Sequence, residues 1–207
     1  SVRSDGRLLD AESDHPSISG DGRYVAFQSR ASTPGDPGGP WRVFVHDRST
    51  GVTRVISEDE LGRSARLDSA RPAISADGRF VAFESDAALV GADRNGRRDV
   101  YRHDLRESRI ELVSVSSTGE VGNASSRGAS ISADGSMIAF GSGAGNLVVG
   151  DTNLVPDVFV RDMSARATYR VSVGTEGEQA DASSRRPAIN ADGSMVVFES
   201  FALTLTG

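Results

Sequence analysis

The sequence predicts an all-β protein built from repeated four-stranded sheets. Three observations predict it: one motif recurs along the chain at nearly constant spacing, each complete copy carries four short strand candidates, and no long window shows the 3.6-residue periodicity of a helix. The four copies of the motif read HPSISGDGRYVAFQS, RPAISADGRFVAFES, GASISADGSMIAFGS and RPAINADGSMVVFES. Their turn glycines, Gly22, Gly78, Gly135 and Gly193, are separated by 56, 57 and 58 residues.

The first two strands of each unit are predicted by a turn and by the apolar run that follows it. In the second copy, Asp77-Gly78 supplies two residues that tolerate positive φ, as a tight hairpin requires. The run at 80–83 is apolar at every position, so this strand must be covered on both faces. Two more candidates follow, DVYRHDL and IELVSVS in this copy. Sheets packed face to face around an axis satisfy these constraints, which predicts a β-propeller with blades of about 57 residues.

The repeated motif also resembles a known family. The pattern P-x-I-S-x-D-G-R-x-V-A-F-x-S, followed by D-V-[FY]-V-x-D, resembles the TolB-like (WD40-like) β-propeller repeat of many bacterial secreted and periplasmic proteins. The resemblance covers essentially the whole chain and implies an extracellular or periplasmic location. It implies little about activity, because propellers serve many unrelated functions.

The repeat divides a single predicted domain, residues 1–207, into about three and a half blades. Three complete blades are expected at 15–70, 71–126 and 127–184, and the inner strands of an incomplete blade at 185–207. Residues 1–14 are expected to supply an outer strand, within 1–6, and a linker of a split blade. Closed propellers usually have four or more blades, so we expect either a fragment of a longer propeller or self-association that completes one.

Composition disfavours several classes of partner. The chain has 23 basic and 29 acidic residues and a net charge of −6, which disfavours nucleic acid as a partner. No apolar run approaches the roughly 20 residues of a membrane-spanning helix, so no membrane insertion is expected. The chain contains no cysteine, which excludes disulfides, thiolate catalysis and cysteine–zinc sites.

Two loops carry a recurring set of oxygen-bearing side chains. Asp93, Asn95 and Asp99 in the second unit correspond to Asp151, Asn153 and Asp157 in the third. Calcium prefers hard oxygen ligands from carboxylates, amides and backbone carbonyls, so both sets are candidate Ca²⁺ sites. The alternative is that these residues stabilise turns through hydrogen bonds to the backbone. The first unit keeps Asp36 but has Gly38 and Arg42 at the other two positions, and both interpretations accommodate that change.

Catalytic residues are not evident. His46 and His103 occupy equivalent positions, where the third unit has Arg161, so we expect an exposed strand position there. No zinc spacing and no Gly-x-Ser-x-Gly nucleophile motif occurs. The recurring Asp residues of the turns are expected to accept backbone hydrogen bonds. Arginines recur near the start of the innermost strands and could line the central channel, namely Arg71, Arg127, Arg185 and Arg186.

These observations favour a non-catalytic extracytoplasmic scaffold for protein or glycan binding, with calcium as a candidate stabilising ligand. The alternative is that the chain is the propeller module of a larger secreted hydrolase or lyase. A third interpretation, a propeller that is itself a lyase or lectin, requires His, Arg or aromatic side chains clustered on one face.

Overall fold

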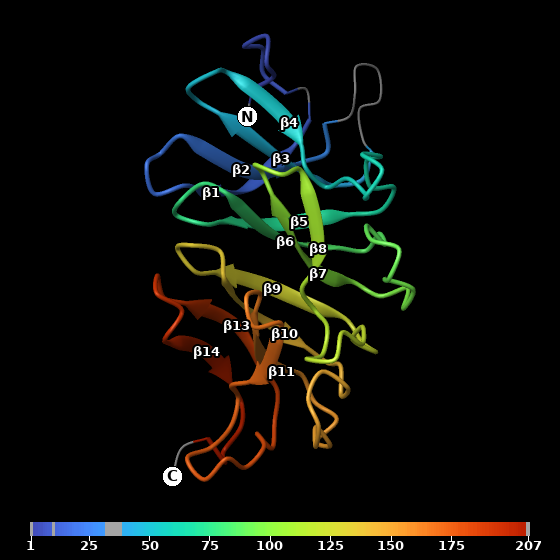
Figure 1. Ribbon diagram of the computed structural model, residues 1–207, viewed down its shortest axis with the longest axis vertical. Coiled ribbons are helices and arrows are strands. Elements are labelled where there is room, and N and C mark those ends of the chain that lie inside the picture. Colours follow the sequence, from blue (N-terminus) through green and yellow to red (C-terminus); the bar gives the residue numbers. More distant parts are fainter. Residues whose placement is uncertain (1, 10, 32–38, 206–207) are drawn as a thin grey trace.

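The chain folds into antiparallel sheets that pack against one another in chain order. The computed structural model describes residues 2–9, 11–31 and 39–205. Within these residues there are three four-stranded sheets, one two-stranded sheet and no helix. Figure 1 shows the blue first sheet at one end, the green second sheet next to it, and the red fourth sheet beside the yellow and orange third sheet. The predicted all-β fold of about three and a half blades is confirmed.

Each sheet is a meander in which strands adjacent in sequence are paired. Blade one contains β1 (Ser13–Ile18), β2 (Tyr24–Ser29), β3 (Arg42–Asp47) and β4 (Val52–Val55). Blade two contains β5 (Ser69–Ile74), β6 (Phe80–Ser85), β7 (Asp99–Asp104) and β8 (Arg109–Leu112). Blade three contains β9 (Ser126–Ile131), β10 (Met137–Ser142), β11 (Asp157–Asp162) and β12 (Ala167–Arg170). The fourth sheet contains β13 (Ser184–Ile189) and β14 (Val196–Ser200).

The apolar cores lie between the blades, as the unbroken apolar runs predicted. Ala26 of β2 packs in one cluster with Val81 and Phe83 of β6, whereas Ala82 of β6 packs in the next cluster with Phe140 of β10. Successive residues of one strand therefore enter two different cores, because side chains alternate between the faces of a strand. Val25 and Phe27, on the other face of β2, pack in a smaller cluster with Leu9 and Ala11.

Neighbouring blades interlock at the first hairpin turn. Gly78, Gly135 and Gly193 all have φ between +71° and +76°, and a Cβ at each would lie 2.4–2.7 Å from the side chain that begins the second strand of the previous blade. That side chain is Tyr24, Phe80 or Met137. Hydrogen bonds connect the same turns, for example from Gly20 N to Ala76 O at 2.8 Å. Glycine is thus required at these turns for its conformation and for the close approach of the next blade.

The first strands of neighbouring sheets are in contact, so they are innermost and line the axis. Each contains a bulge, visible as a shift in its register with the second strand. One residue of each bulge has a positive φ, in the left-handed region. Only one of these four residues is glycine: His15, Arg71, Gly128 and Arg186. The bulge turns a backbone amide toward the preceding blade. Gln28 Oε1 accepts from Arg71 N at 2.8 Å, and Glu84 Oε2 accepts from Gly128 N at 3.1 Å.

The N-terminal segment, predicted to include an outer strand in residues 1–6, forms the first of four small hairpins. Val2 bridges Leu8, just as Val115 bridges Val121 farther along the chain. The segment packs on β4, where Thr53 Oγ1 donates to Val2 O at 2.6 Å. Residues 2–8 therefore lie against blade one, and the outer strand of a split blade within residues 1–6 stays a prediction. Residues 1, 10, 206 and 207 of the predicted terminal pieces lie outside the described residues.

Replacing Gly135 by alanine tests the interlocking of the blades. The left-handed backbone alone costs about 1–2 kcal/mol, and overpacking against Phe80 adds about 1–3 kcal/mol. Gly22→Ala is the matched control, because Gly22 has φ +70° but a Cβ added there would meet nothing closer than 3.6 Å. Urea denaturation should show a clearly larger loss of unfolding free energy for Gly135→Ala. Equal losses would contradict the proposed steric constraint.

Candidate functional site

The structure brings the predicted loop residues of blade two together. Asn95 Nδ2 donates to Asp99 Oδ2 at 2.6 Å and to Gly122 O at 2.8 Å. Ser114 Oγ donates to Asp99 Oδ1 at 2.6 Å, and the Tyr101 hydroxyl donates to Asp93. Asp93 and Asp99 are only 5% and 0% exposed. Asn95 thus acts as a donor that joins the loop, the start of β7 and the following hairpin.

The loop of blade three repeats this arrangement with a different counter-charge. Asn153 Nδ2 donates to Asp157 Oδ2 at 2.8 Å and to Ala180 O at 3.0 Å. Asp151 Oδ1 lies 3.2 Å from Arg170 Nη1, where the second blade has Leu112 at the end of its outer strand. Arg170 therefore supplies one positive charge beside the two carboxylates of this loop.

The hydrogen bonds favour the turn interpretation, because both asparagines donate to a carboxylate. Among the described residues, no three His, Cys, Asp or Glu side chains are grouped so that they could hold a metal ion. Calcium at Asp93, Asn95 and Asp99, or at Asp151, Asn153 and Asp157, stays a prediction. Asp36 and Gly38 of the first unit lie outside the described residues, so that comparison is confined to Arg42.

Burial shifts the pKa values of Asp99 and His103, which lie toward opposite ends of β7, in opposite directions. Burial raises the pKa of Asp99 to about 6, against the hydrogen bonds from Ser114 and Asn95 that lower it. Burial, together with the positive charge of Arg54, lowers the pKa of His103 to about 4. The pKa of Asp151 is also raised, by burial and by the neighbouring charge of Asp157.

The expectation that His103 and Arg161 are exposed was wrong. His103 is 7% and Arg161 6% exposed, because the preceding blade or hairpin covers this position of the third strand. Arg54 of β4 reaches across to donate to Leu105 O at 2.9 Å, and Arg161 Nη1 donates to Ser116 O at 3.0 Å. His46 is only partly buried.

The turn aspartates have the predicted structural role. Asp77 Oδ1 accepts from Arg79 N at 3.0 Å, and Asp104 Oδ1 accepts from Arg106 N at 2.9 Å. Equivalent bonds recur in the other blades, at Asp21, Asp134, Asp192, Asp47 and Asp162.

A cavity of about 530 Å³ gathers the arginines of the innermost strands. Its ten lining residues include four arginines and no acid: Arg71, Ser125, Arg127, Gly128, Gly141, Gly143, Pro156, Ser184, Arg185 and Arg186. Glu199 accepts from Arg185 Nε at 3.4 Å and from Arg186 Nη1 at 3.1 Å, and Arg71 Nε lies 3.5 Å from Glu84 Oε1. Arg127 forms no ion pair with another described residue. The cavity size and convergent donors suit a small anionic group.

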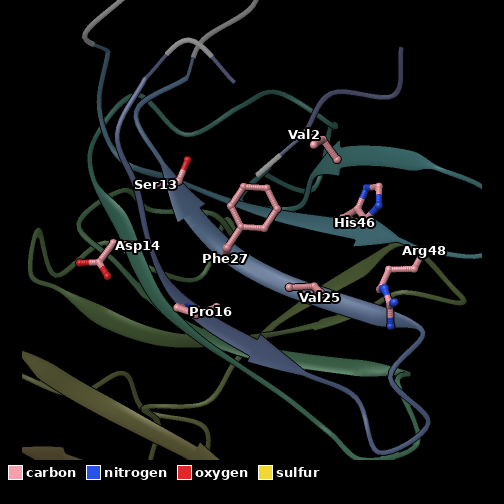
Figure 2. Close-up of a pocket in the computed structure, with 8 residues that line it drawn as sticks. All are labelled: Val2, Ser13, Asp14, Pro16, Val25, Phe27, His46 and Arg48. Carbon is pink, nitrogen blue, oxygen red and sulfur yellow. The ribbon is translucent and has the colours of Figure 1, made fainter. Parts of the chain in front are cut away.

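A second cavity, of about 360 Å³, lies on the other face of blade one (Figure 2). Figure 2 shows the Phe27 ring and Val25 on β2, with Val2 and His46 beside them. The corresponding β6 and β10 residues, Val81 and Ile138, are fully buried against the preceding blade. His46 Nδ1 is engaged with Thr53 Oγ1 at 2.8 Å. This cavity is thus the uncovered packing surface of a sheet.

Comparison with solved structures identifies the architecture. TolB from Acinetobacter baumannii matches with a TM-score of 0.56 and 20% identity, over 91% of this chain and 37% of that one. The putative TolB from Agrobacterium tumefaciens matches with a TM-score of 0.54 and 19% identity, over 95% of this chain and 62% of that one. The fold is that of a TolB-like β-propeller. This chain therefore spans less than two thirds of either TolB structure.

The TolB-like fold is shared with parts of enzymes. The β-propeller domain of the trilobed protease from Pyrococcus furiosus matches with a TM-score of 0.51 and 13% identity, over 79% of this chain and 44% of that one. No family model matches the sequence, and no curated protein matches it. The described residues contain no helix long and apolar enough to cross a membrane.

Sequence comparison singled out the arginines but missed what surrounds them. Their convergence depends on contacts across a blade junction, which no local motif encodes. The aligned repeats do contain a signal. The motif ends in QS, ES and ES in its first, second and fourth copies, but in GS in its third, where Gly141 replaces the polar residue. Arg170 was missed because it replaces an apolar residue at only one of the outer strands.

The raised pKa of Asp99 and the lowered pKa of His103 predict that removing either group changes the pH dependence of the unfolding free energy, in opposite directions. Asp99 binds its proton more readily when folded, so its contribution to stability increases as pH falls from about 6 toward 4. His103 binds its proton less readily when folded, so its contribution decreases as pH falls from about 6.5 to 4. Each slope can reach about 1.4 kcal/mol per pH unit.

Urea denaturation at several pH values in this range measures both slopes. Relative to the unmodified chain, His103→Gln should gain stability on acidification and Asp99→Asn should lose it. The slopes are compared rather than absolute stabilities, because both substitutions alter buried hydrogen bonding. Identical slopes in the two variants would contradict the assignment.

Proposed function

We propose that this chain is a non-catalytic, ligand-binding propeller that acts outside the cytoplasm. One observation carries the proposal: four arginines and no acid converge on a cavity at the innermost strands. Guanidinium groups are well suited to recognition and poorly suited to proton transfer, because they stay charged at all working pH values. The extracytoplasmic location is supported by the resemblance to secreted and periplasmic repeats.

The described residues around this cavity supply no arrangement for nucleophilic or acid–base catalysis. Its lining contains serines but no His, Asp, Glu, Lys or Tyr that could act as their base. His15, on the axis-facing side of blade one, is exposed, and its Nδ1 lies 3.1 Å from Asp14 Oδ2 rather than contacting a serine. A protein or glycan that presents anionic groups is therefore a ligand rather than a substrate.

The proposal is tested with a panel of neutral and acidic oligosaccharides and peptides. We expect saturable binding, measured by calorimetry, and no bond cleavage, as checked by chromatography of the recovered ligand. The double variant Arg185→Ala/Arg186→Ala should bind at least about tenfold more weakly. Arg106→Ala/Arg109→Ala carries the same charge change at the exposed outer turn of blade two and should bind normally. Cleavage products, or equal binding by both double variants, would contradict the proposal.

The propeller module of a larger secreted hydrolase or lyase is the second candidate. The similarity in fold to the propeller domain of a protease favours it. A catalytic domain encoded in the same reading frame would support it. In that case the cavity would select or orient substrates for a separate active site.

Calcium at the second loop is a further part of the proposal. Asp93 and Asp99 are buried and form no ion pair with any described residue, whereas Arg170 lies beside Asp151 and Asp157. A cation at the second loop would relieve the burial of two carboxylates. At the third loop, Arg170 already supplies the positive charge.

Thermal unfolding of chelator-treated protein, with and without millimolar calcium, tests this preference. Binding to the folded state alone should raise Tm, and magnesium is the control. Asp93→Ala should abolish the rise, whereas Asp151→Ala should retain it. No rise in the unmodified chain would leave Asp93, Asn95 and Asp99 with the turn role alone.

A further inference from the structure

In blades one and two, the second strand carries a polar residue that closes the junction to the next blade. At the first two junctions this residue is Gln28 and Glu84, which are 6% and 1% exposed. Each accepts the bulge amide of the following innermost strand, that of Arg71 or Gly128. The Glu84 carboxylate is also 3.3 Å from Arg98 Nη1. A buried carboxylate thus fills the second junction and is held by an amide and two guanidinium groups.

The third junction lacks this side chain, because the equivalent residue of β10 is Gly141. The amide corresponding to those of Arg71 and Gly128 is Arg186 N, and no described side chain accepts from it. A Cβ at Gly141 would meet Arg127 O at 3.7 Å, Arg185 Cα at 3.9 Å and Asp157 O at 3.9 Å. These are ordinary contacts, so the missing side chain leaves space.

That space forms part of the arginine-lined cavity. Arg127, Arg185 and Arg186 come from the two innermost strands of this junction, and Arg71 reaches it from blade two. Glu84, Asp86 and Glu199 lie beside this group and the adjoining Arg98. Five guanidinium groups therefore face three carboxylates, which leaves an excess of two positive charges, and Arg127 is the one of the five that forms no ion pair with a described residue.

We propose that the third junction binds a small organic ligand with two carboxylates, one of them occupying the space that the Glu84 side chain fills at the second junction. This carboxylate accepts from Arg186 N, and the second pairs with Arg127 at the open side. Planar carboxylates match the fork of guanidinium donors, which favours them over other dianions. The inference rests on the proposed ligand-binding function and specifies its chemistry.

Substitutions at residue 141 test the proposal without removing an arginine. Gly141→Glu restores the internal carboxylate and should abolish binding, with Tm unchanged or raised. Gly141→Ala adds only a methyl group and should bind normally. Calorimetric titration at low salt uses succinate, citrate and a disaccharide of two uronic acids, with sulfate as a dianion that lacks carboxylates.

We expect at least one carboxylate probe to bind the unmodified chain and Gly141→Ala, at least about tenfold more tightly than sulfate. Binding of succinate or citrate would indicate a free organic acid, and binding of the disaccharide alone would indicate an acidic sugar. Equal affinity for sulfate, or unchanged affinity in Gly141→Glu, would overturn the proposal. Because Arg127 is exposed, the affinity should also fall as ionic strength rises.

The failure of this inference is distinguishable from failure of the proposed function. If neutral oligosaccharides or peptides bind and Arg185→Ala/Arg186→Ala weakens them, the cavity is a binding site but not for dicarboxylates. If no member of either panel binds the unmodified chain, both proposals are contradicted.

Discussion

The close contact between each first hairpin turn and the preceding blade is the constraint on which the rest of the structure depends. The turn glycines at 78, 135 and 193 have no room for a side chain, so each sheet is held at a defined distance from its neighbour. At that distance the second strands are covered on both faces and can be apolar throughout. The bulges of the innermost strands are then close enough to reach side chains of the preceding blade.

Functional candidates arise where one copy of the repeat departs from the others. Gly141 replaces a hydrogen-bond acceptor, Arg170 replaces an apolar residue, and Tyr101 replaces phenylalanine beside a buried Asp93. Each departure is isolated, because the shared core and turns are preserved around it. In this chain the residues that recur in every repeat form the strands, turns and cores. The residues that differ between repeats introduce charged groups or leave space between blades.

The fold was predictable from sequence because its determinants are local and repeated. Asp-Gly turns, apolar runs and constant spacing specify strands, hairpins and stacking together. The site was less predictable, because it depends on which blade covers a given face. His103 is buried and lies within the field of Arg54, which precedes it by 49 positions, whereas the same strand position in blade one is only partly covered. Likewise, the spacing of Asp93, Asn95 and Asp99 could not reveal that the asparagine amide would be the donor.

The left-handed bulges give the propeller an unusual kind of versatility. At the three junctions between blades they present a backbone amide whatever the side chain, since Arg71, Gly128 and Arg186 all adopt the conformation. Whether that amide is internally satisfied is decided by a single residue on the neighbouring strand. A substitution at that one residue can therefore fill or empty the space between two blades, while the turns and the cores around it stay the same. Each junction of the repeat can in this way differ from its neighbours by a single side chain.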